Sequence, residues 1–229
     1  MPAIGILGGM GPQASAKLYE LLIKGTQRYT TAAFDNDYPE IVLLSVPVPN
    51  FISNKNELPN AKQMLVKRTK LLEQAGCTVI GIACNTAHIL LPELQAVTSV
   101  PFLSMPELVA EQAKTAGYTR VGLLATPTTL SSTLYDEALA GTAAMVRPEA
   151  GFAEQIESYI YLELSGRLPE AERQEFRVKV DAFRQTNNLD AVILGCTELP
   201  LIYGESSGDA SVIDTLQLLA DNLLASYFA

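Results

Sequence analysis

The sequence has few of the features that would direct this protein to a membrane, a nucleic acid or a metal. No apolar run approaches the ~18 residues that a bilayer-spanning helix needs. Basic residues are scarce, since 16 Lys and Arg stand against 25 Asp and Glu and give a net charge of -9. A surface of that sign repels phosphate backbones and anionic lipids, so neither is an expected partner. The chain has one His and no C-x-x-C pair, which argues against a metal site.

Two further absences bear on where the protein acts. The first residues lack the basic stretch of a signal peptide, and glycines interrupt their apolar run. Cysteine is rare: Cys77, Cys84 and Cys196 form an odd number in a chain without an export signal. Free thiols in a reducing compartment are therefore expected, and with them a cytoplasmic location.

The 229 residues, 48% of them hydrophobic, suit one large globular domain or two small ones. Short apolar runs alternate with longer segments of helical periodicity, which is typical of βαβ units and a parallel sheet. Strands are expected at 3–7, 41–46, 78–83, 100–103, 120–125, 143–147 and 190–195. Helices are expected at 12–29, 61–75, 86–94 and 106–117, around Ile156 and Val180, and from Asp214 onward.

The two halves of the chain resemble each other. G-I-L-G-G-M at Gly5 parallels G-L-L-A-T-P at Gly122, and V-I-G-I-A-C-N-T around Cys84 parallels A-V-I-L-G-C-T-E around Cys196. We therefore predict an α/β protein of two pseudo-symmetric lobes, each a parallel sheet flanked by helices, with an active site in the cleft between them. Residues 1–98 plus 208–229 are expected to form the N-terminal lobe with a returning C-terminal helix, and residues 99–207 the second lobe.

Cys84 and Cys196 are the candidate catalytic residues. Each directly follows a predicted strand, and ligands of parallel sheets gather at the carboxyl ends of the strands. Each also opens a helical segment, where backbone N–H groups favour a thiolate. Two thiols facing one cleft from opposite sides could invert a stereocentre, because inversion by deprotonation needs a base on one face and an acid on the other.

Other interpretations of the cysteines stay open. A lone cysteine is usually a small buried hydrophobe, and Cys77, which has no polar followers, fits that description. A redox couple between Cys84 and Cys196 is a further possibility if their sulfurs approach, although redox pairs usually lie close in sequence.

Several neighbouring residues are candidate substrate ligands. The turn that contains Met10 and Gly11 is neither a dinucleotide fingerprint nor a P-loop, and its backbone N–H groups could approach a carboxylate. Thr126 and Thr129 occupy the matching turn of the second half, where helix capping is an equally good role. Glu198 could orient a substrate ammonium or simply suit a helix start. His88, one helical turn after Cys84, could tune that thiol or fill a core position.

The opening G-I-L-G-G-M-G-P-x-A-S, the A-C-N-T-A-H around Cys84 and the G-C-T-E-L-P around Cys196 together resemble the aspartate/glutamate racemase family, in particular its aspartate racemase branch. The resemblance covers essentially the whole chain. It implies two pseudo-symmetric α/β lobes and a racemase that uses neither pyridoxal phosphate nor a metal. It also implies that Cys84 and Cys196 are the catalytic bases, with Asn85, Thr86, Thr126, Thr129 and Thr197 at positions that resemble the ligands of the α-carboxylate and amino group. A homodimer is implied by the resemblance alone.

One departure concerns the substrate. Aspartate racemases typically carry an Arg just after the Pro-rich loop of the second strand, whereas Pro47 to Phe51 contains no cation. Arg167, after the turn at Ser165 and Gly166, could substitute for that cation or could equally be a solvated surface residue. Aspartate, or else glutamate, is therefore the expected substrate, with a neutral or differently anchored one as an alternative. A hydantoin racemase, a maleate-isomerase-like enzyme and a non-catalytic small-acid binding protein also remain open.

Overall fold

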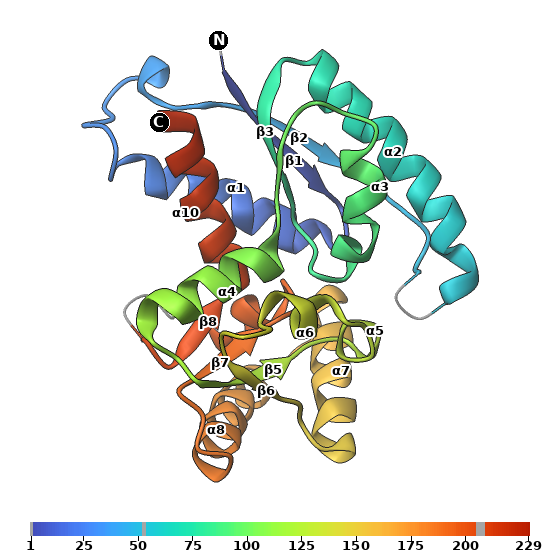
Figure 1. Ribbon diagram of the computed structural model, residues 1–229, viewed down its shortest axis with the longest axis vertical. Coiled ribbons are helices and arrows are strands. Elements are labelled where there is room, and N and C mark those ends of the chain that lie inside the picture. Colours follow the sequence, from blue (N-terminus) through green and yellow to red (C-terminus); the bar gives the residue numbers. More distant parts are fainter. Residues whose placement is uncertain (1, 52–53, 205–208) are drawn as a thin grey trace. The chain divides into compact units, whose positions relative to one another are not determined.

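The computed structural model describes residues 2–51, 54–204 and 209–229. The chain divides into two compact units, Met1–Ser104 with Leu216–Ala229 and Met105–Thr215. Within the described residues, each unit contains a four-stranded parallel sheet, and the strand orders β2-β1-β3-β4 and β6-β5-β7-β8 are equivalent (Figure 1). The predicted fold class, two similar α/β lobes, is confirmed. The matching strand orders also show that the duplication seen in the sequence extends to the topology.

The first unit places helices on both faces of its sheet. In Figure 1, α1 and α10 lie on one side of the strands, and α2 and α3 lie on the other. Its elements are β1 (Ala3–Gly8), α1 (Pro12–Thr26), η1 (Asp35–Asp37), β2 (Glu40–Ser45), η2 (Lys55–Glu57), α2 (Leu58–Gln74), β3 (Cys77–Ile82), η3 (Thr86–Leu90), α3 (Leu91–Gln95), β4 (Phe102–Leu103) and α10 (Thr215–Phe228).

The strands of this sheet are apolar on both faces because both faces are covered. All six residues of β1 are buried. Leu7 packs in a core with Leu65 and Leu72 of α2. The preceding residue, Ile6, points to the other face of the sheet and is also fully buried. Burial on both sides explains why the sequence of β1 reads as a continuous apolar run.

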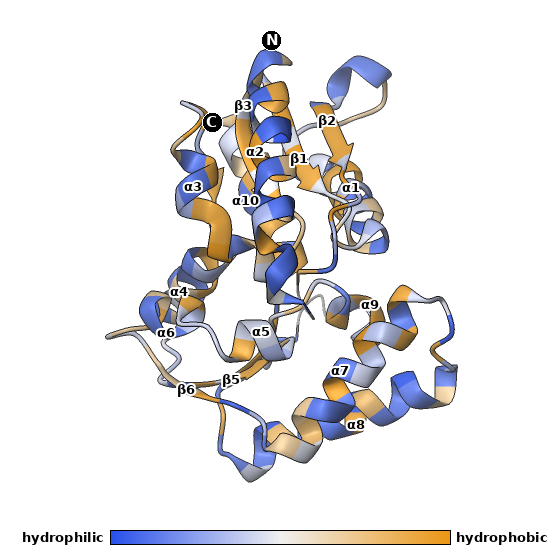
Figure 2. Ribbon diagram, turned by 90° about the vertical axis from the view of Figure 1, so that its right-hand side faces the viewer, coloured by the Kyte–Doolittle hydropathy of each residue, from blue (hydrophilic) through white to orange (hydrophobic). Residues whose placement is uncertain are grey.

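The second unit repeats the arrangement. Its elements are α4 (Met105–Ala116), β5 (Arg120–Leu124), α5 (Pro127–Leu130), α6 (Leu134–Ala138), β6 (Ala144–Val146), α7 (Ala150–Leu164), α8 (Glu170–Thr186), β7 (Ala191–Leu194), α9 (Leu199–Tyr203) and β8 (Val212–Asp214). One core joins Leu124 and Leu194 of the central strands to Ile156 of α7 and Phe176 of α8. The helices are two-faced, with polar residues along their outer sides (Figure 2).

The unit boundaries differ from those expected. β4 pairs with β3 and so completes the first sheet, although residues 99–207 are expected in the second lobe. β8 pairs with β7 in the second sheet, and the sequence pattern does not predict this strand at all. The expected boundary between 207 and 208 lies outside the described residues. Short edge strands of two and three residues explain the difference, because they carry too little pattern to reveal their partner.

The segment after Cys84 also departs from expectation. In place of one helix through Leu94 it forms the 3-10 helix η3 followed by the five-residue α3. Pro92 lies in the first turn of α3. Proline has no N–H to donate to the carbonyl four residues earlier, so a continuous α-helix is broken there.

Across the residues that the structure describes, no helix combines the length and the apolar character needed to cross a membrane.

Candidate active site

The candidate residues lie at the carboxyl edges of the two sheets. Cys84 follows the last residue of β3, Ile82, by two positions, and Cys196 follows the last residue of β7, Leu194, by two positions. Each of these strands pairs with the first strand of its half, β1 or β5. The Ala83 N–H donates to the carbonyl of Leu7 at 3.0 Å, and the Gly195 N–H donates to that of Leu124 at 2.7 Å. The backbone hydrogen bonds that precede the two cysteines are therefore equivalent.

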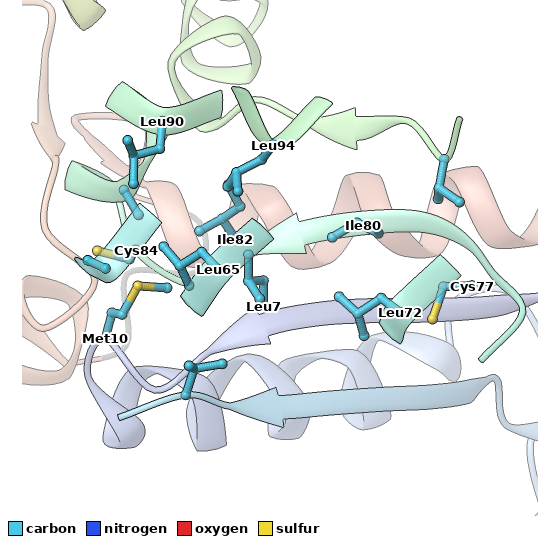
Figure 3. Close-up of a cluster of buried hydrophobic side chains, with 14 of the residues drawn as sticks. Leu7, Met10, Leu65, Leu72, Cys77, Ile80, Ile82, Cys84, Leu90 and Leu94 are labelled. Atoms are coloured by element: carbon cyan, nitrogen blue, oxygen red, sulfur yellow. The ribbon is translucent and has the colours of Figure 1, made fainter. Parts of the chain in front are cut away.

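We call Met10, Gly11, Cys84, Asn85 and Thr86 the first cluster. β1 and β3 are parallel neighbours, so the turns that leave them meet at one edge of the sheet. Figure 3 shows Met10 beside Cys84 at one end of the buried apolar core. Cys84 is 3% exposed, and Asn85 and Thr86 are similarly buried at 1% and 2%.

Glycine is required in the turn before Met10. Gly9 has a φ of +93°, and a side chain there would meet the Val46 backbone nitrogen at 2.3 Å. The Gly9 N–H donates to the hydroxyl of Ser15 at 2.8 Å. This hydrogen bond therefore holds the turn against α1.

His88 contacts the backbone beside Cys84. Its Nδ1 lies 2.9 Å from the carbonyl oxygen of Cys84 and 3.2 Å from that of Asn85. Carbonyls only accept, so Nδ1 carries the proton. Burial lowers the pKa of His88, against the effect of the nearby carbonyls of Cys84, Asn85 and Leu103, which favour the charged ring. The ring thus acts on the main chain of the cysteine as a neutral donor.

Cys77 lies apart from the first cluster. It begins β3, at the opposite end of the same apolar core from Cys84 (Figure 3). Burial raises the pKa of its thiol, with the charge of Glu40 as a smaller cause. These surroundings agree with the prediction that Cys77 is a structural residue.

We call Thr126, Thr129, Cys196, Thr197 and Glu198 the second cluster; all five are buried. Thr126 is the N-cap of α5, and its hydroxyl oxygen accepts a hydrogen bond from the Thr129 N–H at 3.3 Å. The Thr126 hydroxyl also donates to that of Thr129 at 3.1 Å. The capping role considered for Thr126 is therefore present in the structure.

Glu198 contacts the second cysteine directly. The Cys196 thiol donates to Glu198 Oε2 at 3.0 Å, and the Thr197 hydroxyl donates to the same oxygen at 3.3 Å. Cys196 is 6% exposed and Glu198 is 3% exposed. The second cluster thus joins a thiol to a buried carboxylate.

Tyr135 of α6 is a neighbour of Cys196 that the sequence does not reveal. It is 1% exposed. Burial raises its pKa, and ionisation of Cys196 would raise it further, so its hydroxyl stays protonated. α6 is a five-residue helix, which is too short to show helical periodicity, and no motif marks this tyrosine.

Arg167 and the loop that contains Phe51 both concern the choice of substrate. Arg167 is exposed in the turn that ends α7, and its Nε donates to the Ser165 hydroxyl at 3.0 Å. In the loop after β2, Phe51 is 2% exposed and joins the apolar core that contains Met10 and Cys84. This part of the loop therefore contributes an apolar side chain to the core beside the first cluster.

Among the described residues, no group of three or more His, Cys, Asp and Glu is arranged to hold a metal ion.

Comparison with known proteins identifies the class to which this fold and these clusters belong. The model of the Asp/Glu/hydantoin racemase family matches residues 7–223, so the chain belongs to this family. Over 226 residues it is 25% identical to the broad specificity amino-acid racemase of Bacillus subtilis strain 168, covering 99% of this chain and 98% of that relative.

Solved structures agree. An aspartate racemase homologue from Pyrococcus horikoshii superposes with a TM-score of 0.83 at 28% identity, covering 99% of each chain. The aspartate racemase of Picrophilus torridus gives a TM-score of 0.78 at 31% identity, covering 99% of this chain and 94% of that one. The chain is therefore an isomerase of the racemase type.

Proposed function

We propose that the protein is an amino-acid racemase that uses no pyridoxal phosphate and inverts Cα by proton transfer between Cys84 and Cys196. The observation that carries this proposal is the equivalence of the two cysteines. Each is buried, lies two residues beyond a central strand and is followed by two polar residues. Family membership supports the same reaction type.

In the proposed reaction, one cysteine as thiolate removes the α-proton, and the other as thiol protonates the opposite face of the carbanion. The cysteines exchange roles for the other enantiomer. Because an amino-acid α-proton is very weakly acidic, the charge that develops on the α-carboxylate must be stabilised by hydrogen bonds. The proposed donors are the backbone at Met10 and Gly11 and the side chains of Asn85, Thr86, Thr126, Thr129 and Thr197. The Glu198 carboxylate has the charge needed to bind the ammonium group.

The proposed substrate is aspartate, with glutamate next. The similarity to aspartate racemases along the whole chain supports this choice. The apolar Phe51, which belongs to the same core as Cys84 and lies in a loop without a cation, favours a second candidate, an amino acid with an uncharged side chain. The Bacillus subtilis relative, named for broad specificity, makes that candidate worth testing.

The test is incubation of the purified protein with single enantiomers of the common amino acids, without pyridoxal phosphate or added metal. Chiral chromatography should show the opposite enantiomer of aspartate, glutamate or an uncharged amino acid. Hydantoins and maleate are tested in parallel, because turnover of either in place of amino acids would assign another reaction of the family.

Binding of an amino acid without turnover of any compound would contradict the proposal and favour a small-acid binding protein. Sedimentation of the same preparation tests the homodimer, which stays a prediction.

A further inference from the structure

The contact between Cys196 and Glu198 gives the two cysteines different electrostatic surroundings. The 3.0 Å hydrogen bond joins a thiol and a carboxylate that are both more than nine-tenths buried. Ionising both groups would place two negative charges side by side with little water to screen them, which is strongly unfavourable. We therefore expect the pair to keep one proton near neutral pH.

The proton of this pair belongs on sulfur. An isolated carboxyl of Glu loses its proton at about pH 4.3 and an isolated thiol at about pH 8.5, so the carboxylate is the weaker base. The hydroxyl of Thr197 donates to the same Glu198 oxygen and stabilises the carboxylate further. The favoured state is a protonated Cys196 that donates to an ionised Glu198.

In the first cluster, the position that corresponds to Glu198 carries a neutral side chain. Glu198 lies two residues after Cys196, and Thr86 lies two residues after Cys84. Cys84 therefore lacks a charge at the position from which Glu198 acts on Cys196. The neutral ring of His88 contacts the main chain of Cys84.

We propose that Glu198 keeps Cys196 protonated, so that Cys84 carries the negative charge of the resting thiol pair. The part concerning Cys84 rests on the proposed function, in which both cysteines serve one substrate. The resting enzyme is then prepared for the enantiomer whose α-proton faces Cys84: Cys84 accepts that proton, and Cys196 donates its own to the opposite face. Turnover leaves a thiol at Cys84 and a thiolate beside Glu198, and this state recovers by losing a proton from Cys84 and regaining one at Cys196.

Tyr135 is a further titratable side chain near Cys196. Its hydroxyl is fully buried and remains neutral, so it adds no charge to the pair. Of these two side chains, Glu198 is the one that places a charge in direct contact with the Cys196 thiol, and we assign the asymmetry between the two cysteines to it.

The test measures alkylation of each cysteine by iodoacetamide across a range of pH, without substrate, with peptide mass spectrometry to separate Cys84 from Cys196. In the wild-type protein, Cys84 should reach half-maximal reactivity at a lower pH than Cys196. Glu198→Gln keeps the shape of the side chain and removes its charge. It should raise the rate at Cys196 near neutral pH by about tenfold, as expected for removal of one close like charge. Glu154→Gln, which removes an exposed carboxylate of α7, should leave both rates unchanged.

Infrared spectroscopy detects the same proton without requiring reagent access to a buried sulfur. The serine variants assign the S–H stretching bands, because Cys196→Ser lacks the band of Cys196 and Cys84→Ser lacks the band of Cys84. In the wild-type protein, the band of Cys196 should persist to higher pH than the band of Cys84. An unchanged or lower reactivity of Cys196 in Glu198→Gln would overturn the proposal. Loss of the Cys196 S–H band at a lower pH than the Cys84 band would also overturn it. Neither measurement depends on turnover, so a protein that shows this asymmetry but racemises nothing would refute the proposed function alone.

Discussion

The three cysteines are all buried, yet their neighbours differ in kind. Cys77 begins a strand within an apolar core. Cys84 lies beside Met10, with a histidine bound to its carbonyl. Cys196 donates to a carboxylate. Burial alone therefore does not distinguish the three cysteines, and the polar groups beside each of them do.

Cys77→Ala should leave racemisation unchanged. The substitution removes one buried sulfur atom far from the first cluster and should lower the free energy of unfolding by about 1 kcal/mol. Activity assays and urea unfolding of the variant check both expectations. A large loss of activity in a folded variant would contradict the structural role of Cys77.

His88 should make stability depend on pH near neutrality. Burial lowers its pKa below the ordinary value of 6.5, so the folded ring stays neutral where the unfolded ring gains a proton. The contribution of the neutral ring to the free energy of unfolding is fully present above pH 6.5. It is lost as the pH falls from there toward the lower pKa of the folded state. Between pH 7 and 5.5 this loss should be about 1 kcal/mol.

Urea unfolding at these two pH values measures the loss in the wild-type protein and in His88→Asn, whose amide can donate where Nδ1 does. The variant should lose less stability on acidification. The carboxylates with lowered pKa, such as Asp190 and Glu73, titrate below this range. Equal pH dependence of the two proteins would rule out a neutral buried His88.

At the scale of elements, close packing between strands and helices fixes where small residues must lie. A side chain on Gly122 of β5 would meet Phe183 of α8 at 2.5 Å and Leu189 at 2.6 Å. Gly5, its counterpart in the duplicated motif, would likewise meet Cys77 and Ile80, each at 3.1 Å. The glycines of the two repeats therefore have a packing role.

Gly122→Ala should lower the free energy of unfolding by about 1 to 3 kcal/mol, because the ring of Phe183 must be displaced from a packed core. Gly151→Ala is the matched control. It lies exposed in α7, where an added methyl group has room, and should raise stability by up to about 1 kcal/mol. Thermal unfolding compares the two variants, and equal melting temperatures would contradict the packing argument.

The longer elements could be predicted from the sequence, and several of the shorter ones could not. The seven expected strands are present as β1 to β7, and Gly76 and Gly117 end helices with positive φ as expected of C-terminal glycines. β8, α5 and α6 contain three to five residues, fewer than a hydrophobic period needs to become visible. Tyr135 lies in α6 and cannot be recognised from the sequence for the same reason.

At the scale of the whole molecule, internal duplication explains why the sequence predicted so much of the candidate site. Two matching strand-to-cysteine motifs place the two thiols at equivalent edges of equivalent sheets. The repeat cannot predict how its copies differ. The hydrogen bond from Cys196 to Glu198 depends on side-chain rotamers, and the bond from His88 to the Cys84 carbonyl depends on a 3-10 turn. These contacts arise from tertiary packing.

The central claim is that one substrate exchanges protons with two cysteines on opposite faces. Its most direct test follows each enantiomer of the substrate in deuterated water, in the wild-type protein, Cys84→Ala and Cys196→Ala. In early turnover the wild-type product should carry deuterium at Cα while the remaining substrate retains hydrogen. Each alanine variant should invert at least about a hundredfold more slowly, since it lacks one acid–base group. Undiminished inversion in either variant, or a product that retains the substrate's own α-hydrogen, would contradict the account.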